Sequence, residues 1–160
     1  MKILQRFIGL PWSRKRLYLE ATLWLLLSWG LVRGLPFRLW SSWLGEQRSA
    51  DSESMAEESK DPRVVPICRC IESINARLGG RLTCLMLAMA VHWMLRRRNI
   101  ASSLVLGTLA ERMPDQSLKL KAHAWVNHGA GVVLGGNTGE EYFPISSFVH
   151  APPAARGQAR

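Results

Sequence analysis

The spacing of apolar residues changes from a helical to a strand period near Asn99, and this change decides which class of fold the chain can adopt. Before Asn99, apolar residues recur at steps of three and four, which is typical of helices. After it, short alternating or β-branched runs are separated by Gly, Asn, Pro and Asp, which predicts antiparallel strands. These runs are 103–109, 118–127, 131–135 and 141–146. Helices followed by a sheet in a chain of 160 residues predict an α+β fold with one hydrophobic core.

Apolar periodicity and breaker residues predict the helices and the organisation of the chain. The helical runs are 13–34, 36–44, 64–78 and 82–98. The last is apolar almost all round, so we expect it at the centre of the core, with Thr83 as its cap. The organisation predicted is an N-terminal helical segment (1–45), an acidic linker (46–62), a catalytic domain (63–150) and a disordered tail (151–160).

The first helix has a basic start and an uninterrupted apolar stretch, 21–32, that is about half the length needed to cross a bilayer. We favour a helix that docks on the domain. The alternative is a membrane-surface anchor, which would place the protein peripherally at the inner membrane. The residues that favour the anchor are Arg14, Lys15, Arg16, Trp24, Trp29, Trp40 and Trp43.

Net charge and cysteine content limit the classes of partner and the cellular compartment that the chain predicts. The net charge of +9 and pI near 10.3 indicate attraction to acidic surfaces of membrane, nucleic acid or protein. No nucleic-acid partner is predicted, because the basic residues lack a recognition motif or interleaved aromatics. Arg96, Arg97 and Arg98 are interpreted as a helix end instead, since a helix dipole favours cations there. Three cysteines and no visible secretion signal predict a cytoplasmic protein without a disulfide framework.

The pair Cys68 and Cys70 lacks the further ligands that would close a zinc site, so neither a metal nor another cofactor is expected. We expect Cys70 to point inward and Cys68 outward from their helix. Cys84 differs, because it falls in the first turn of the central helix. Unpaired backbone N–H groups and the positive end of the helix dipole favour a thiolate there, and they are suited to receive an oxyanion.

His123 is the base that we expect to act with Cys84. It lies in a predicted strand between Ala122 and Ala124, whose small side chains point to the opposite face. A cysteine at a helix start and a histidine on an adjoining strand form the dyad needed for acyl transfer. His92 and His128 are weaker candidates, because one lies in mid-helix and the other in a turn.

Several motifs form a pattern that goes beyond the dyad. They are Cys84–Ala90, Trp93–Ile100, Leu106–Gly107 and His123–Val126, with Leu35–Arg38 and Trp43–Gly45 nearer the N-terminus. Together they resemble the transglutaminase-like leader peptidases of lasso-peptide biosynthesis. The resemblance implies a transglutaminase-like or papain-like cysteine peptidase core, in which a central helix packs on an antiparallel sheet. It also implies a Cys84 nucleophile and a His123 base.

The activity that the resemblance implies is thiol proteolysis that severs the leader from a ribosomally made precursor peptide. An asparagine-synthetase-like cyclase then closes the ring. Because the chain starts directly with the helical segment, we expect a separate protein to recognise the leader. The alternative is a non-catalytic, membrane-associated scaffold for precursor and cyclase.

The third catalytic residue departs from the family pattern, which places an Asp about a dozen residues after the histidine, where this chain has Gly135. A two-residue hairpin loop, Gly129–Ala130, would pair His123 with residue 136, and a loop one residue longer would pair it with Asn137. We therefore expect Asn137 as a substitute that fixes the imidazole tautomer. Glu140, Glu141 or a bare dyad are the alternatives.

Overall fold

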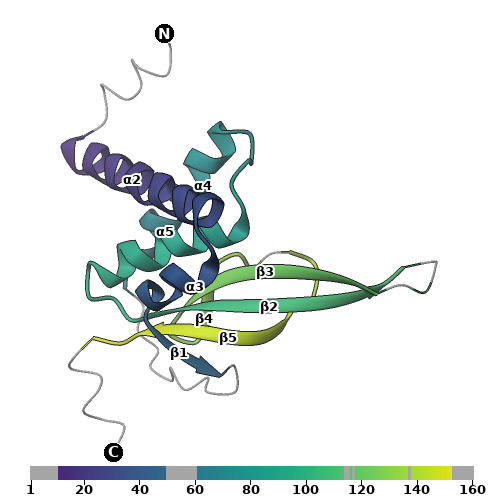
Figure 1. Ribbon diagram of the computed structural model, residues 1–160. Helices are drawn as coiled ribbons and strands as arrows, with labels where there is room; N and C mark the ends of the chain where they lie inside the picture. The colour runs from purple at the N-terminus through teal and green to yellow at the C-terminus, as the bar shows by residue number, and fades with distance from the viewer. Residues whose placement is uncertain (1–10, 50–60, 114–115, 117, 137, 153–160) are drawn as a thin grey trace, which may run out of the picture.

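The computed structural model describes residues 11–49, 61–113, 116, 118–136 and 138–152. It shows a layer of helices on one side of a five-stranded sheet (Figure 1). The helices are α2 (Trp12–Gly34), α3 (Phe37–Trp40), the 3-10 helix η1 (Ser41–Leu44), α4 (Val64–Arg77) and α5 (Cys84–Arg96). The strands are β1 (Glu46–Ser49), β2 (Ser102–Arg112), β3 (Leu118–His128), β4 (Gly131–Leu134) and β5 (Phe143–His150). The α+β prediction is confirmed.

Helix α5 lies between the sheet and α2 (Figure 1). Nine of its residues are buried, from Met86 to Leu95, so it forms the centre of the core as its all-round apolar pattern predicts. Ion pairs join α2 to the residues at the C-terminal end of α5. Arg98 donates two hydrogen bonds to the Glu20 carboxylate, at 2.9 and 2.6 Å, and Arg96 donates to the Trp43 carbonyl. Arg97 lies 3.8 Å from the same carboxylate, so all three consecutive arginines make contacts within the protein.

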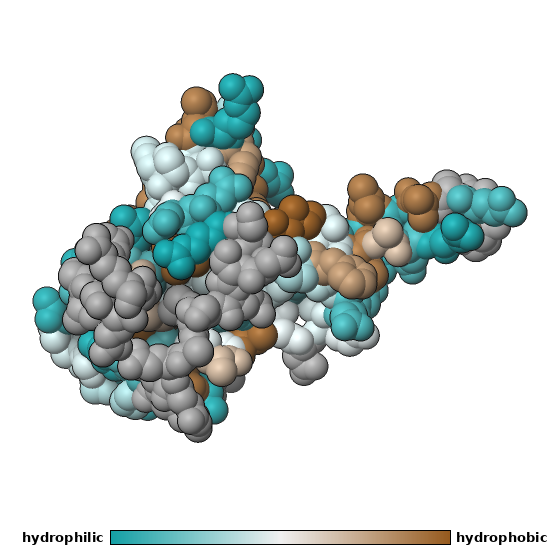
Figure 2. All heavy atoms as spheres, turned by 90° about the horizontal axis from the view of Figure 1, so that it is seen from below, coloured by the Kyte–Doolittle hydropathy of each residue, from teal (hydrophilic) through white to brown (hydrophobic). Residues whose placement is uncertain are grey.

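The sheet is antiparallel, with the order β1-β5-β2-β3-β4. Its longest pairing joins β2 and β3, from Ser103 opposite Asn127 to Arg112 opposite Leu118. The far end of this hairpin extends beyond the helical layer (Figure 1), and from the sheet side it stands clear of the body as an arm (Figure 2). The near half of β3 is therefore packed into the core, while its first residues are exposed.

Strand β1 corrects the expectation that a linker begins at residue 46. Glu46–Ser49 pairs with β5, from Glu46 opposite Val149 to Ser49 opposite Ser146. This edge strand has no apolar face. Backbone hydrogen bonds to β5 hold it in the sheet, so its sequence can be polar. Gly45 precedes it with φ +128, and a Cβ there would stand 2.8 Å from the Val149 carbonyl oxygen. Residues 50–60 of the expected linker and 153–160 of the expected tail lie outside the described residues.

The expected orientation of Cys68 is wrong. Cys68 and Cys70 are both buried, with 5% and 4% of their surface exposed. Helix α4 contacts α2, α5 and β4, so more than one of its faces is covered. The spacing of apolar residues along a helix identifies one buried face. Cys68 lies on a second face, which is buried because other elements cover it, so the spacing could not predict its burial.

His92 in α5 joins three parts of the fold from a completely buried position. Its Nε2–H donates to the Leu44 carbonyl at 2.7 Å, because a carbonyl can only accept, and its Nδ1 therefore accepts from the Ser102 hydroxyl at 3.1 Å. Burial lowers the pKa of His92 to about 4. The imidazole is thus a neutral link between η1, α5 and β2.

Stability should depend on pH through His92. Its pKa is lower in the folded protein than the ordinary value of 6.5, so the unfolded chain takes up a proton first as the pH falls. We expect the free energy of unfolding to fall by about 3 kcal/mol between pH 6.5 and pH 4 from this group. Urea unfolding across that range measures it. The variant His92→Gln should be less stable near neutrality and show a shallower slope, and an unchanged slope would contradict the assignment.

Candidate active site

Cys84 is the first residue of α5, as the sequence predicts. Thr83 caps the helix, and its hydroxyl accepts a hydrogen bond from the Met86 N–H at 3.4 Å. The first turn of α5 contains no acidic residue, so no side-chain charge in this turn offsets the positive end of the helix dipole. The thiol is half-buried, whereas Cys68 and Cys70 are buried. Of the three cysteines, Cys84 is the one placed for reaction with an external substrate.

Burial makes the other two thiols poor nucleophiles. It raises the pKa of Cys68 to about 12 and that of Cys70 to about 11. Because the thiolate is the reactive form, both side chains are protonated near neutral pH and are structural. The burial of the pair on α4 contrasts with the partial exposure of Cys84.

His123 lies near the middle of β3 and is oriented by a backbone carbonyl. Its Nε2 lies 2.7 Å from the oxygen of Gly135. A carbonyl can only accept, so Nε2 carries the hydrogen, and in the neutral ring Nδ1 keeps its lone pair. Within the described residues Nδ1 makes no hydrogen bond. The contact with Gly135 therefore selects the tautomer in which Nδ1 can act as a base.

Tyr142 borders the imidazole of the predicted dyad. Its ring centroid lies 4.9 Å from that of His123. The pKa of Tyr142 is raised, first by its hydrogen bond to the Glu140 carboxylate. No hydrogen bond joins Cys84 and His123 in the described residues, and contacts between a nucleophile and its base commonly tighten only when substrate binds.

Trp125 supports the imidazole from within the same strand. Its ring stacks with His123, with centroids 6.0 Å apart and planes inclined at 20°. Gly107 lies opposite His123 on β2, and a Cβ there would stand 2.7 Å from two atoms of the Trp125 ring. The missing side chain at Gly107 leaves the space that the indole occupies. Sequence positions 107, 123 and 125 therefore form one packed unit.

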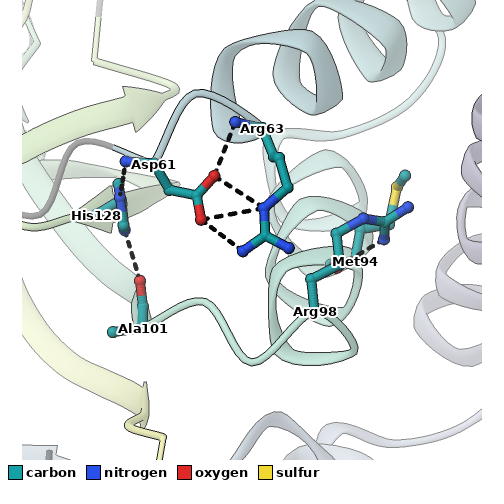
Figure 3. Close-up of polar contacts among 6 residues, drawn as sticks. All are labelled: Asp61, Arg63, Met94, Arg98, Ala101 and His128. Atoms are coloured by element: carbon teal, nitrogen blue, oxygen red, sulfur yellow. Dashed lines mark hydrogen bonds and ion pairs between the residues drawn. The ribbon is translucent and has the colours of Figure 1, made fainter.

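The two other histidines considered as bases are fully engaged. The Nδ1–H of His128 donates to the Ala101 carbonyl at 2.7 Å, so its Nε2 accepts from the Asp61 N–H at 3.3 Å (Figure 3). Asp61 is held in turn by Arg63, which lowers the pKa of that carboxyl to about 2. His92 also uses both ring nitrogens. His128 and His92 are therefore structural, and neither has a ring nitrogen free to act as a base.

The structure offers a different third member from those expected. Asn137 lies outside the described residues. The hairpin loop has two residues, with His128 opposite Gly131, but a bulge between Val126 and Asn127 then shifts the register. Glu140 is bound to Lys121 and Tyr142, and neither it nor Glu141 forms a hydrogen bond with His123 in the described structure. The acceptor that reaches His123 is the Gly135 carbonyl, from the position of the family Asp.

Gly135 can present this carbonyl only as a glycine. Its φ is +82, and a Cβ would stand 3.0 Å from the Ala124 carbonyl oxygen and 3.1 Å from the Trp125 Cβ. A side chain at this position would be both strained and in contact with backbone. The aspartate of the family pattern therefore does not fit this backbone conformation.

Comparison with known proteins agrees with this architecture. The sequence model of the Transglutaminase-like superfamily matches residues 31–147. The chain belongs to this superfamily. Transglutaminase-like domains are commonly cysteine peptidases or transferases that share this fold. No curated protein and no solved structure matches the chain significantly. The match and the architecture together establish the transglutaminase-like fold.

Sequence reasoning missed two parts of this site, Tyr142 and the Gly135 carbonyl. Tyr142 immediately precedes β5 and is brought to His123 by the pairing of β5 with β2. A backbone acceptor has no side-chain signature. The one available signal was the glycine at position 135, where the family has an aspartate. It shows that the carboxylate is missing, but it does not show which group takes its place.

Proposed function

We propose that this protein is a cysteine peptidase that removes the leader from a lasso-peptide precursor. The observation that carries the proposal is the Nε2–H···O=C bond from His123 to Gly135, because it leaves Nδ1 as a proton acceptor on β3, the strand against which α5 packs with Cys84 as its first residue. The superfamily match supports thiol chemistry on this fold. The resemblance of the motifs around Cys84 and His123 supports the leader-peptidase assignment.

The reaction proposed is acyl transfer to sulfur. His123 Nδ1 takes the Cys84 proton, and the thiolate attacks the carbonyl carbon of the peptide bond between leader and core. Backbone N–H groups in the first turn of α5 receive the oxyanion. Collapse breaks the C–N bond, and the imidazolium gives its proton to the leaving amine, which is the new N-terminus of the core. Water, with His123 as base, then hydrolyses the thioester and releases the leader.

The proposed partners follow from the same assignment. They are the precursor peptide, a separate protein that recognises the leader, and an asparagine-synthetase-like cyclase that consumes the released core. The basic character of the chain, with a net charge of +9, favours acidic partner surfaces in this assembly. A short precursor reading frame beside the gene, followed by a gene for such a cyclase, would be the simplest supporting observation.

The product masses test the proposed function. The purified protein, incubated with its cognate precursor and leader-recognition protein, should give two peptides whose summed mass is that of the precursor plus one water. Mass spectrometry measures this directly. A product that has instead lost ammonia through a new isopeptide bond would identify a transglutaminase, and an unchanged precursor would favour the scaffold.

A further inference from the structure

The outer face of α2 is apolar although solvent surrounds it. The helix buries one stripe, Ala21, Leu25, Ser28 and Leu31, against the rest of the helical layer. A second stripe, which we call the outer stripe, consists of Trp12, Leu19, Leu23, Leu26 and Trp29. Its three leucines are each more than 60% exposed. Large apolar side chains gathered on an exposed face mark an interaction site.

The charges around the outer stripe are almost all of one sign. Helix α2 carries Arg14, Lys15 and Arg16 in its first turns and Arg33 in its last. Its one acidic residue, Glu20, belongs to the inner side, where it is bound to Arg98 at 2.6 Å. Cations therefore flank both ends of a leucine-rich centre. This distribution matches the surface of an anionic bilayer, where cations meet lipid phosphates and leucines reach the acyl boundary.

The two tryptophans strengthen the match to a lipid surface. Trp12 and Trp29 lie towards opposite ends of the outer stripe, 71% and 50% exposed. Indole rings favour the boundary between headgroups and hydrocarbon, because they are apolar with one polar N–H. No described helix is both long and apolar enough to span a bilayer. Since α2 is docked on α5 along its inner side, only its outer stripe is available, and that geometry suits a helix lying flat.

A hollow beside the stripe has the same chemistry. It has a volume of about 370 Å³ and lies between α2, η1 and α5. Its lining consists of Trp24, Leu27, Trp43, Trp93, Arg96 and Arg97. Leu27 and Trp43 are also exposed, so the hollow extends the apolar face, and the two guanidinium groups extend its cationic rim.

We propose that the outer stripe of α2 binds the surface of a membrane that contains anionic phospholipid, with the helix parallel to the bilayer. The surface helix then holds the transglutaminase-like domain at the membrane. This attachment is independent of the reaction at Cys84, which lies on another helix.

Vesicle flotation tests the proposal with the full-length protein. It should bind vesicles of mixed phosphatidylcholine and phosphatidylglycerol much more strongly than vesicles of phosphatidylcholine alone, and high salt should weaken the binding. The triple variant Leu19→Ser, Leu23→Ser, Leu26→Ser should lower the bound fraction at least about tenfold. The matched control is Leu118→Ser, Leu120→Ser, which changes leucines of the projecting hairpin that are 66% and 72% exposed and should bind as the wild type does.

Three outcomes would overturn the proposal. They are equal binding to both kinds of vesicle, failure of the wild type to float with either kind, and equal loss of binding in both variants. Sedimentation in the absence of lipid identifies the other occupant: a concentration-dependent dimer that only the triple variant loses would make this face an interface between two copies. Circular dichroism confirms that the variants are folded. Precursor cleavage in solution should be unchanged in the triple variant. A failure of the membrane-binding proposal can therefore be distinguished from a failure of the proposed peptidase activity.

Discussion

The variant Cys84→Ala is expected to lose cleavage of the precursor, with a rate lower by about 10⁴-fold or more, because no other described thiol can take the place of the nucleophile. The fold should be kept, since Cys84 is half-buried and follows the Thr83 cap instead of forming it. Mass spectrometry of the precursor measures cleavage, and thermal unfolding checks the fold. Full cleavage by the variant would remove the proposed mechanism.

The other cysteines supply the matched control. The double variant Cys68→Ala, Cys70→Ala should retain activity at a temperature where it is folded, because both thiols are buried and protonated. In the wild type a thiol-reactive probe at neutral pH should label Cys84 well before Cys68 or Cys70. Equally slow labelling of all three would favour the non-catalytic scaffold.

Introducing an aspartate at the family position, Gly135→Asp, is expected to impair the proposed peptidase activity. The new side chain would meet the Ala124 carbonyl oxygen and the Trp125 backbone, so residue 135 would have to move and would carry its own carbonyl away from His123. Loss of the group that fixes a catalytic histidine tautomer lowers kcat by up to about 10⁴-fold in serine proteases. We expect a fall of about 10²- to 10⁴-fold in kcat, and Gly135→Ala should behave alike.

Gly139→Ala separates this effect from simple backbone strain. Gly139 has φ +68, close to that of Gly135, but a Cβ there would meet nothing within 4 Å. Both alanine variants should therefore lose about 1–2 kcal/mol of stability from the left-handed backbone, while only the variant at 135 should lose activity. Steady-state kinetics and urea unfolding of the pair give the comparison. A Gly135→Asp enzyme as active as the wild type would mean that the carbonyl does not position His123.

Much of the fold could be predicted from the sequence, because the spacing of apolar residues indicates which side of a helix or strand is buried. The helix expected over 82–98 contains α5, the strand expected over 103–109 lies within β2, and the strand expected over 118–127 is almost all of β3. Strand β1 could not be found in this way, since Glu46–Ser49 pairs through backbone groups and has no apolar face. The burial of Cys68 was missed for a related reason, because it depends on which elements surround α4.

The candidate site likewise has parts that the sequence predicts and parts that it does not. The position of Cys84 follows from Thr83 and the start of an apolar helix, and His123 stands out through its small neighbours, so both have local signatures. The Gly135 carbonyl and Tyr142 do not. One depends on a positive φ next to a bulge, and the other on the pairing of β5 with β2. Side-chain chemistry could be inferred from the residues, whereas a backbone acceptor required coordinates.

The attachment of β1 to β5 makes the first third of the chain inseparable from the last. Glu46 lies opposite Val149, and the Leu44 carbonyl just before it accepts the hydrogen bond of buried His92. A cut of the backbone between Ser49 and Asp61 would leave two fragments, neither of which contains a complete core. The chain should accordingly melt in a single transition, and a shortened version that begins at α4 would leave an unprotected strand edge prone to self-association.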